Sequence, residues 1–190
     1  MRGRWAGATV ACLASGPSLS VEQLASVRDW QGPGHHVIAV NTTFKSAPWA
    51  DVLFAMDRRW WTHYLAEAKA TFHGELWTSA IKIVGVNTAP YAKLGSLGNS
   101  GAGAILLARY FGAERVVLLG YDGRRGPKGE VHHHGDHPKR LSNALSLPKW
   151  AGQFERMATR LNGMDVVNCS PETAIRVFRT AAMDEVLCSH

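Results

Sequence analysis

Short apolar runs alternate with helical patterns along this chain, and that alternation limits the folds that it can adopt. Six runs have the length and composition of buried strands, at residues 8–13, 37–40, 52–56, 81–84, 116–119 and 165–167. Strands that alternate with helices predict an α/β fold with a mainly parallel sheet flanked by helices. The length of 190 residues suits a single domain spanning residues 1–190.

Capping signals place the ends of the predicted helices. Ser20 and Gln23 form a capping box, which predicts that the first helix starts at Ser20. Gly112 ends a helix rich in Ala and Leu, and Asn162 with Gly163 ends the last one. The three later helices are expected over residues 58–72, 100–111 and 148–161.

Charge and cysteine content narrow the partners and the compartment. Twenty-one Lys and Arg against fifteen Asp and Glu give a net charge of +6. This charge favours an anionic partner such as a nucleotide, a phosphorylated acceptor or DNA, although a generic basic surface explains it equally well. Cys12, Cys169 and Cys188 show no CxxC spacing, so a reducing, cytoplasmic location is expected. No apolar run approaches the ~20 residues that a membrane span needs.

Polar or small residues follow three of the predicted strands. Ser15 and Gly16 come after the first strand, Asn41 after the second and Asp57 after the third. In an open parallel sheet, ligands bind beyond the carboxyl ends of the strands. The pattern therefore predicts one binding site across these loops.

Two predicted helices begin with glycine-bearing segments. Glycine lets a backbone approach a phosphate closely, and a helix N-terminus offers free amide groups. Neither segment matches GxGxxG or a Walker loop, and each can also be a plain turn or packing feature. Together they favour nucleotide binding. They are the loop of Gly16, Pro17 and Ser18 and the helix start of Asn99, Ser100 and Gly101.

Residues 121–147 form a long, basic and histidine-rich segment, as is typical of a lid or a binding loop. It contains His132, His133, His134 and His137. These histidines could ligate zinc, supply a general base or acid, or be solvated. No second cluster offers further zinc ligands, so no metal site is assigned.

Trp60 and Trp61 are neighbours on the second predicted helix. They could stack a base or a sugar. The commoner arrangement buries one ring in the core and leaves the other at the rim. An exposed face at Trp60 would favour oligomers, and the oligomeric state is left open.

Five segments in a fixed order carry a resemblance to known proteins. They are GPSL (16–19), VIAVNT (37–42), VLFAMD (52–57), NSGAGAILLARYFGAERVVLLGYDG (99–123) and HHHGDHP (132–138). The set, within residues 8–171, resembles the bacterial sialyltransferases of glycosyltransferase family 42. It is also similar to a wider family of unknown function that includes an archaeal 6-hydroxymethylpterin diphosphokinase. Short members of that family occur in phage and prophage genomes, which would place this chain in a bacterial host cytoplasm.

The resemblance implies a Rossmann-like fold that holds a cytidine nucleotide. The residues carried over as nucleotide-binding are Ser15, Gly16, Asn41, Asp57, Ser100, Gly101, Gly120, Tyr121 and Asp122. The family's catalytic histidine matches His137 best, and His134 is the second possibility. The family has Asn where this chain has Ser15 and Asp57, and this chain lacks the sialyltransferases' inserted lid with its sugar-binding tyrosines.

These observations predict a sialyltransferase-like glycosyltransferase. It would use a CMP-type nucleotide-sugar donor, no permanently bound cofactor, and His137 or His134 to deprotonate an acceptor hydroxyl. One alternative is a Mg-ATP-dependent diphosphokinase of a hydroxymethyl acceptor, with Asp57 and Asp122 as magnesium ligands. Another is a non-enzymatic nucleotide- or DNA-binding phage accessory protein, which the basic residues within 124–140 favour.

Overall fold

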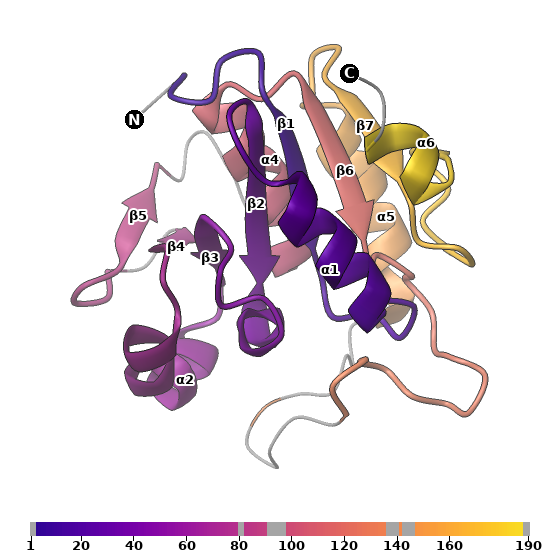
Figure 1. Ribbon diagram of the computed structural model, residues 1–190. Helices are drawn as coiled ribbons and strands as arrows, with labels where there is room; N and C mark the ends of the chain where they lie inside the picture. Colours follow the sequence, from indigo (N-terminus) through magenta and orange to yellow (C-terminus); the bar gives the residue numbers. More distant parts are fainter. Residues whose placement is uncertain (1–2, 80–81, 91–97, 136–140, 142–146, 188–190) are drawn as a thin grey trace.

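A single parallel sheet organises the protein (Figure 1). The computed structural model describes residues 3–79, 82–90, 98–135, 141 and 147–187. Its eight strands lie in the order β5-β4-β3-β2-β1-β6-β7-β8, and every neighbouring pair is parallel. The predicted α/β, Rossmann-like fold with a mainly parallel sheet is thus confirmed.

The helices and strands follow the alternation in the sequence. The strands are β1 (Thr9–Leu13), β2 (His35–Val40), β3 (Val52–Phe54), β4 (Glu75–Ser79), β5 (Asn87–Ala89), β6 (Arg115–Leu119), β7 (Asp165–Asn168) and β8 (Arg179–Thr180). The helices are α1 (Val21–Trp30), the 3-10 helix η1 (Asn41–Lys45), α2 (Arg58–Thr71), α4 (Ser100–Phe111), α5 (Leu147–Ala158) and α6 (Met183–Leu187).

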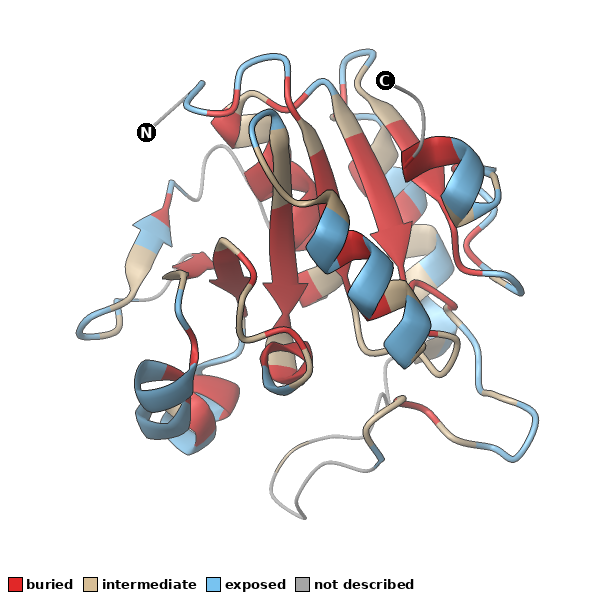
Figure 2. Ribbon diagram, in the orientation of Figure 1, coloured by how far each residue is buried: buried red, intermediate tan, exposed pale blue. Residues whose placement is uncertain are grey.

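Helices cover both faces of the sheet, so the central strands are buried on both sides (Figure 2). In β1, Val10 and Cys12 join the core under α4 and α5, whereas Ala11 and Leu13 join the core under α1, α2 and α6. Strands buried on both faces read as continuous apolar runs. This explains why the sequence pattern located β1, β2 and β6 well.

The fourth strand is wrongly predicted. The chain pairs with β3 through Glu75–Ser79, with Leu76 opposite Leu53; residues 82–84 of the predicted strand lie outside β4, and Ile81 is outside the described residues. Val84 is 87% exposed in a turn that precedes the left-handed Gly85. Only residues 72–74 connect α2 to β4. The strand therefore begins well before the apolar residues 81–84 on which the prediction relied. The elements β5, β8, η1 and α6 were not predicted from the sequence.

Helix ends match the capping signals at two places and differ at a third. The reciprocal Ser20–Gln23 box is present at α1, with N···O distances of 3.1 and 3.2 Å. Gly112 ends α4 in a left-handed conformation with φ 104°. The last long helix stops at Ala158, before the predicted 161. Asn162 and Gly163 follow it as left-handed residues in a separate turn.

Both adjacent tryptophans of α2 are buried, which corrects the expectation that one lies at the rim. The Trp60 indole donates to Thr42 Oγ1 at 3.1 Å, and the Trp61 indole donates to the Ala55 carbonyl at 3.0 Å. Phe44 packs edge-on against Trp60 and fills the space between α2 and η1. Neither ring is available to a base, a sugar or a second copy. In the described part of the chain, no helix is long and apolar enough to cross a membrane.

Two helix-interior glycines should respond in opposite ways to replacement by alanine. A Cβ on Gly103 of α4 would lie 2.5 Å from the buried Phe54 ring. Gly103→Ala is therefore expected to lower the free energy of unfolding by ~1–3 kcal/mol, as overpacked cores do. Gly152 of α5 is the matched control, because the nearest atom to its Cβ is Arg156 Nη1 at 3.6 Å. Gly152→Ala should raise stability by ~0.4–1 kcal/mol in urea unfolding. Equal effects at the two sites would contradict the packing assigned to α4.

Candidate functional site

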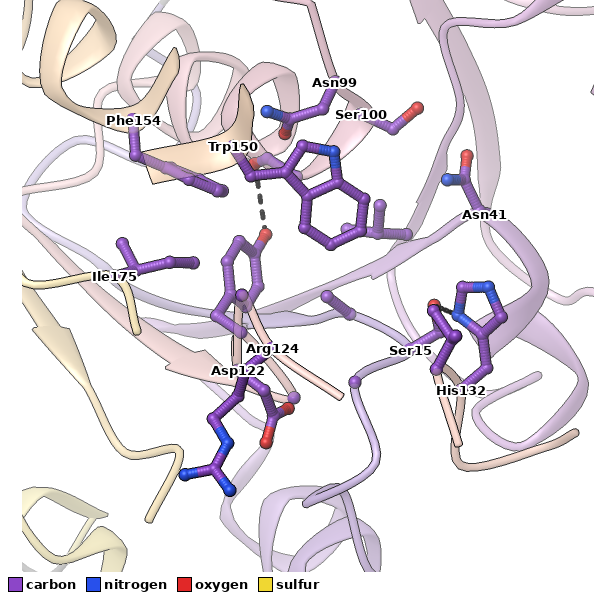
Figure 3. Close-up of a pocket in the computed structure, with 18 residues that line it drawn as sticks. Ser15, Asn41, Asn99, Ser100, Asp122, Arg124, His132, Trp150, Phe154 and Ile175 are labelled. Carbon is purple, nitrogen blue, oxygen red and sulfur yellow. Dashed lines mark hydrogen bonds between the residues drawn. The ribbon is translucent and has the colours of Figure 1, made fainter. Parts of the chain in front are cut away.

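A small pocket lies where β1, β2 and β6 end (Figure 3). β1 has β2 on one side and β6 on the other, so this is the point at which the strand order reverses. Ligands of doubly wound sheets bind at such a point. The first turn of α4 closes the pocket from above, and α5 contributes Trp150 and Phe154. Its volume is about 80 Å³.

Most of the predicted nucleotide-binding residues meet at this pocket. Those that line it are Ser15, Gly16, Asn41, Asn99, Ser100, Gly101, Gly120, Tyr121 and Asp122. Pro17, Ser18 and Asp57 do not line it. Asp57 is exposed, and its side chain accepts from Arg59 N at 2.7 Å as the N-cap of α2. Asp57 and Asp122 therefore do not share the pocket, as a magnesium site built on both would need.

Close backbone contact joins the loops after β1 and β6. The Gly16 amide donates to the Gly120 carbonyl at 2.9 Å. A Cβ on Gly16 would overlap the Asp122 carboxyl group, and Gly120 has a left-handed backbone with φ 68°. Both positions therefore need glycine for steric reasons. The contact brings Asp122 under the loop that follows β1.

Asn41 has two unusual features at the end of β2. Its φ is 51°, a left-handed conformation that side chains rarely adopt but that Asn tolerates better than most. Its Oδ1 atom is buried and has no hydrogen-bond partner among the described residues. Buried polar atoms are normally paired, so this acceptor in a pocket can take a donor from a water molecule or from a ligand.

Asp122 is the second buried acceptor. The residue is only 4% exposed, and Oδ2 has no hydrogen-bond partner in the described part of the chain. Burial raises the pKa of this carboxyl above its ordinary value, because the charged form loses hydration, and hydrogen bonding from Ser18 to the carboxyl group offsets part of that rise. Arg124 lies beside it (Figure 3), but its guanidinium pairs with Glu172 at 3.0 Å. Asp122 is thus suited to accept from a ligand hydroxyl or amino group.

The side chains at the start of α4 are already engaged by the protein. Asn99 Oδ1 accepts from Ala102 N at 2.7 Å, and Asn99 Nδ2 donates to Gln153 Oε1 at 2.7 Å. Ser100 Oγ accepts from Met56 N at 3.1 Å and ties α4 to the end of β3. These residues position the helix, so the partial positive charge of its N-terminus is what they offer a ligand.

The structure brings His132 to the pocket, a residue that the sequence analysis did not single out. Its Nδ1 lies 2.9 Å from Ser15 Oγ, and the next residue's amide donates to the Ser15 carbonyl at 3.0 Å. The His132 ring stacks on His134 with centroids 5.2 Å apart. His134 does not line the pocket, and His137 lies outside the described residues. A run of adjacent histidines gives no sequence signal that separates these orientations.

An apolar wall from the C-terminal half of the chain was also missed. Trp150, Phe154 and Ile175 face the pocket together with Tyr121, whose hydroxyl donates to the Gly101 carbonyl at 3.1 Å. In Figure 3 the Trp150 ring lies next to Asn99 and Ser100. A pocket for a drug-sized ligand usually has ~300 Å³ or more. In this conformation the site is therefore closed to a whole nucleotide.

Clustered metal ligands are not found in the described ranges. No three His, Cys, Asp or Glu residues among them are placed to hold one ion. His133, the middle histidine, points to Ser46, with Nε2 3.2 Å from Ser46 Oγ. The described residues therefore provide no set of zinc ligands around the histidine run, and His137 lies outside the residues searched.

The sequence matches no protein-family model and no curated protein. Among solved structures, the fold is similar to that of the sialyltransferase CstII from Campylobacter jejuni, solved in complex with a substrate analogue, cytidine-5'-monophosphate. The TM-score is 0.58 and the sequence identity is 12%, over 93% of this chain and 86% of that chain. This chain has a sialyltransferase-like α/β fold.

His133 gives the site a testable pH dependence. Burial, followed by the nearby His134, lowers the pKa of His133 from 6.5 to about 4. The folded state therefore binds fewer protons than the unfolded state between these two values, so stability should fall as the pH drops from 6.5 toward 4. After discounting for partial exposure, we expect this residue to contribute ~1–3 kcal/mol to the fall.

Urea unfolding of the His133→Gln variant measures that contribution. The variant should lose less stability than the parent protein between pH 7 and pH 4, since glutamine does not titrate. His73→Gln, at an exposed histidine, is the matched control and should keep the parent's pH dependence. Parallel curves for the parent and His133→Gln would show that His133 is not buried in its neutral form.

Proposed function

We propose that this protein is a nucleotide-sugar-dependent glycosyltransferase that takes a CMP-type donor at the β1–β2–β6 pocket. The observation that carries the proposal is the pair of buried, unpartnered acceptor atoms, Asn41 Oδ1 and Asp122 Oδ2, at the point where the strand order reverses. Amino and hydroxyl groups of a base and a ribose would satisfy them. Support also comes from the fold shared with CstII, whose structure holds cytidine-5'-monophosphate.

The first turn of α4 would receive the phosphate. Its amide groups and dipole favour an anion, and Gly101 keeps a side chain out of the approach. Negative charge grows on this phosphate as the glycosidic bond breaks. Donors held in place by Asn99 and Ser100 would stabilise that charge without reorganising.

A histidine of the 132–137 segment would deprotonate the acceptor hydroxyl. His132 is the described histidine that lines the pocket. If its Nδ1–H donates to Ser15 Oγ, the other ring nitrogen carries the lone pair that a general base needs. The transfer then breaks the bond between the anomeric carbon and the phosphate and forms one to the acceptor oxygen, whose proton passes to the imidazole. His134 and His137 stay as the predictions from sequence.

Donor binding requires the pocket to open. The present volume of about 80 Å³ accommodates only a fragment of a nucleotide. Trp150 lies in the middle of the lining in Figure 3, so its displacement would enlarge the site most directly. Once displaced, the indole could stack on the base, as aromatic rings do in many nucleotide sites.

Nucleotide binding can be measured first, by thermal shift with CMP, UMP, GMP and ATP, each with and without Mg²⁺. At about 100 times its Kd, CMP should add ~2.7 kcal/mol of stability, or roughly 5–10 °C in a chain of this size. A response to ATP that requires Mg²⁺ would instead favour the diphosphokinase. No response to any nucleotide, with salt-sensitive binding of DNA, would favour the accessory protein.

Asn41→Ala should weaken CMP binding about 3–10-fold, the worth of one hydrogen bond. Asn162→Ala is the matched control, because Asn162 also has a left-handed backbone, with φ 50°, but does not line the pocket. It should bind CMP as the parent protein does. Equal weakening in both variants would show that backbone strain, and not the Asn41 amide, causes the loss.

The general base is tested by nucleotide release from CMP-, UDP- and GDP-linked sugars in the presence of an oligosaccharide mixture. His132→Ala should lower turnover ~10²–10⁴-fold and keep the thermal shift with CMP. His134→Ala and His137→Ala test the two earlier assignments in the same assay, and His63→Ala, at an exposed position on α2, is the control. Full turnover by His132→Ala, with loss in one of the others, would move the role to that residue.

A further inference from the structure

A second and larger hollow lies on the other side of residues 132–134, which we call the histidine segment. It runs between α1 and the loop after η1 and has a volume of about 820 Å³. That volume is within the range of ligand sites, unlike that of the pocket at the strand ends. His132 lines the pocket and the adjacent His133 lines the hollow, so the two spaces lie on either side of this part of the chain. We call this hollow the α1 groove.

The floor of the α1 groove is apolar and includes an aromatic ring. Val21, at 76% exposure, and Leu24 line it from α1, and Trp49 lines it from the opposite side. Trp49 is half-buried against the core, so part of its surface is left open to the groove. Val21 and the exposed part of Trp49 thus give the groove apolar surface on both of its sides.

Polar groups of both charges lie along the same groove. Arg28 and Asp29 line it from the last turns of α1, and neither forms an ion pair with any described residue. Ser46 and His133 add a hydroxyl and an imidazole. The formal charges of Arg28 and Asp29 cancel, so the groove has no excess positive charge that would select an anion. A ligand with an apolar face for the ring and hydroxyls for the rim fits this surface.

We propose that the α1 groove binds the acceptor, and that the acceptor is a neutral oligosaccharide. Pyranose rings have a face of C–H groups that packs on Trp49 and a rim of hydroxyls that Arg28 and Asp29 can reach. The groove adjoins the donor pocket through the histidine segment, which puts the end of a bound saccharide near His132. The inference rests on the proposed glycosyltransferase function for the role of the saccharide, but not for its binding.

Two tryptophans allow the two sites to be observed in one experiment. Trp49 lines the α1 groove and Trp150 lines the pocket. In ¹H–¹⁵N spectra of the full chain, their indole signals are assigned with Trp49→Phe and Trp150→Phe. Lactose, maltotriose and chitotriose, which end in different neutral sugars, serve as probes. At least one of them should shift the Trp49 signal and leave the Trp150 signal in place, whereas CMP should shift Trp150.

Variants separate binding in the groove from loss of folding. Trp49→Ala should weaken saccharide binding at least ~10-fold, and Arg28→Ala, at an exposed position, should weaken it several-fold without altering the fold. Trp30→Phe is the matched control, because Trp30 stacks on His35 and does not line the groove. CMP binding should be unchanged in all three variants.

The outcomes distinguish the two proposals. A Trp49 shift with saccharide but no response to CMP would support the groove and overturn the transferase. A response to CMP with no Trp49 shift for any saccharide would overturn the groove and leave the donor pocket standing. Trp49 shifts that follow protein dilution and ignore saccharide would identify the groove as a contact between copies of the chain, which also overturns the proposal.

Discussion

The contact between Gly16 and Gly120 is the constraint on which the site depends. A hydrogen bond of 2.9 Å from the Gly16 amide to the Gly120 carbonyl holds the loop after β1 against the end of β6. Any larger residue at Gly16 would collide with Asp122, and any larger residue at Gly120 would meet the Ala14 carbonyl. Two side-chain-free positions thus allow the crossing that buries Asp122 and brings Ser15 beside His132. The pocket is a consequence of that close approach.

Ser15 connects this crossing to the histidine segment. Its carbonyl accepts from the His133 amide, and its hydroxyl lies 2.9 Å from His132 Nδ1. The segment is therefore fixed at two points to the same residue. His132 and His133 begin a turn that the Gly135 amide closes by donating to the His132 carbonyl, and in this turn His132 lines the pocket whereas His133 lines the α1 groove. In the transfer reaction that we propose, this short piece of chain would contact both the donor and the acceptor.

The sequence allowed the fold to be predicted where burial follows a simple period. β1, β2 and β6 are covered on both faces, so their apolar runs were recognisable, and Ser20 and Gly112 act locally as helix caps. β4 was misplaced because its register depends on the length of the connection from α2. Strand-end loops could be predicted to converge, because parallel strands end at one edge. The contribution of Trp150 and Phe154 to the pocket could not be predicted, since nothing in the local sequence of α5 shows that this helix packs against α4 and faces the pocket.

The two edges of the sheet differ from its centre in a way that affects how copies of the chain meet. β5 has three residues and β8 has two, whereas β2 in the interior has six. Long exposed edges invite pairing with strands of another chain, and short ones offer few unpaired amide and carbonyl groups. The sheet therefore provides little template for edge-to-edge association. Contact between copies through these two edges would therefore involve few backbone hydrogen bonds, and side chains of other surfaces would have to supply the rest of an interface.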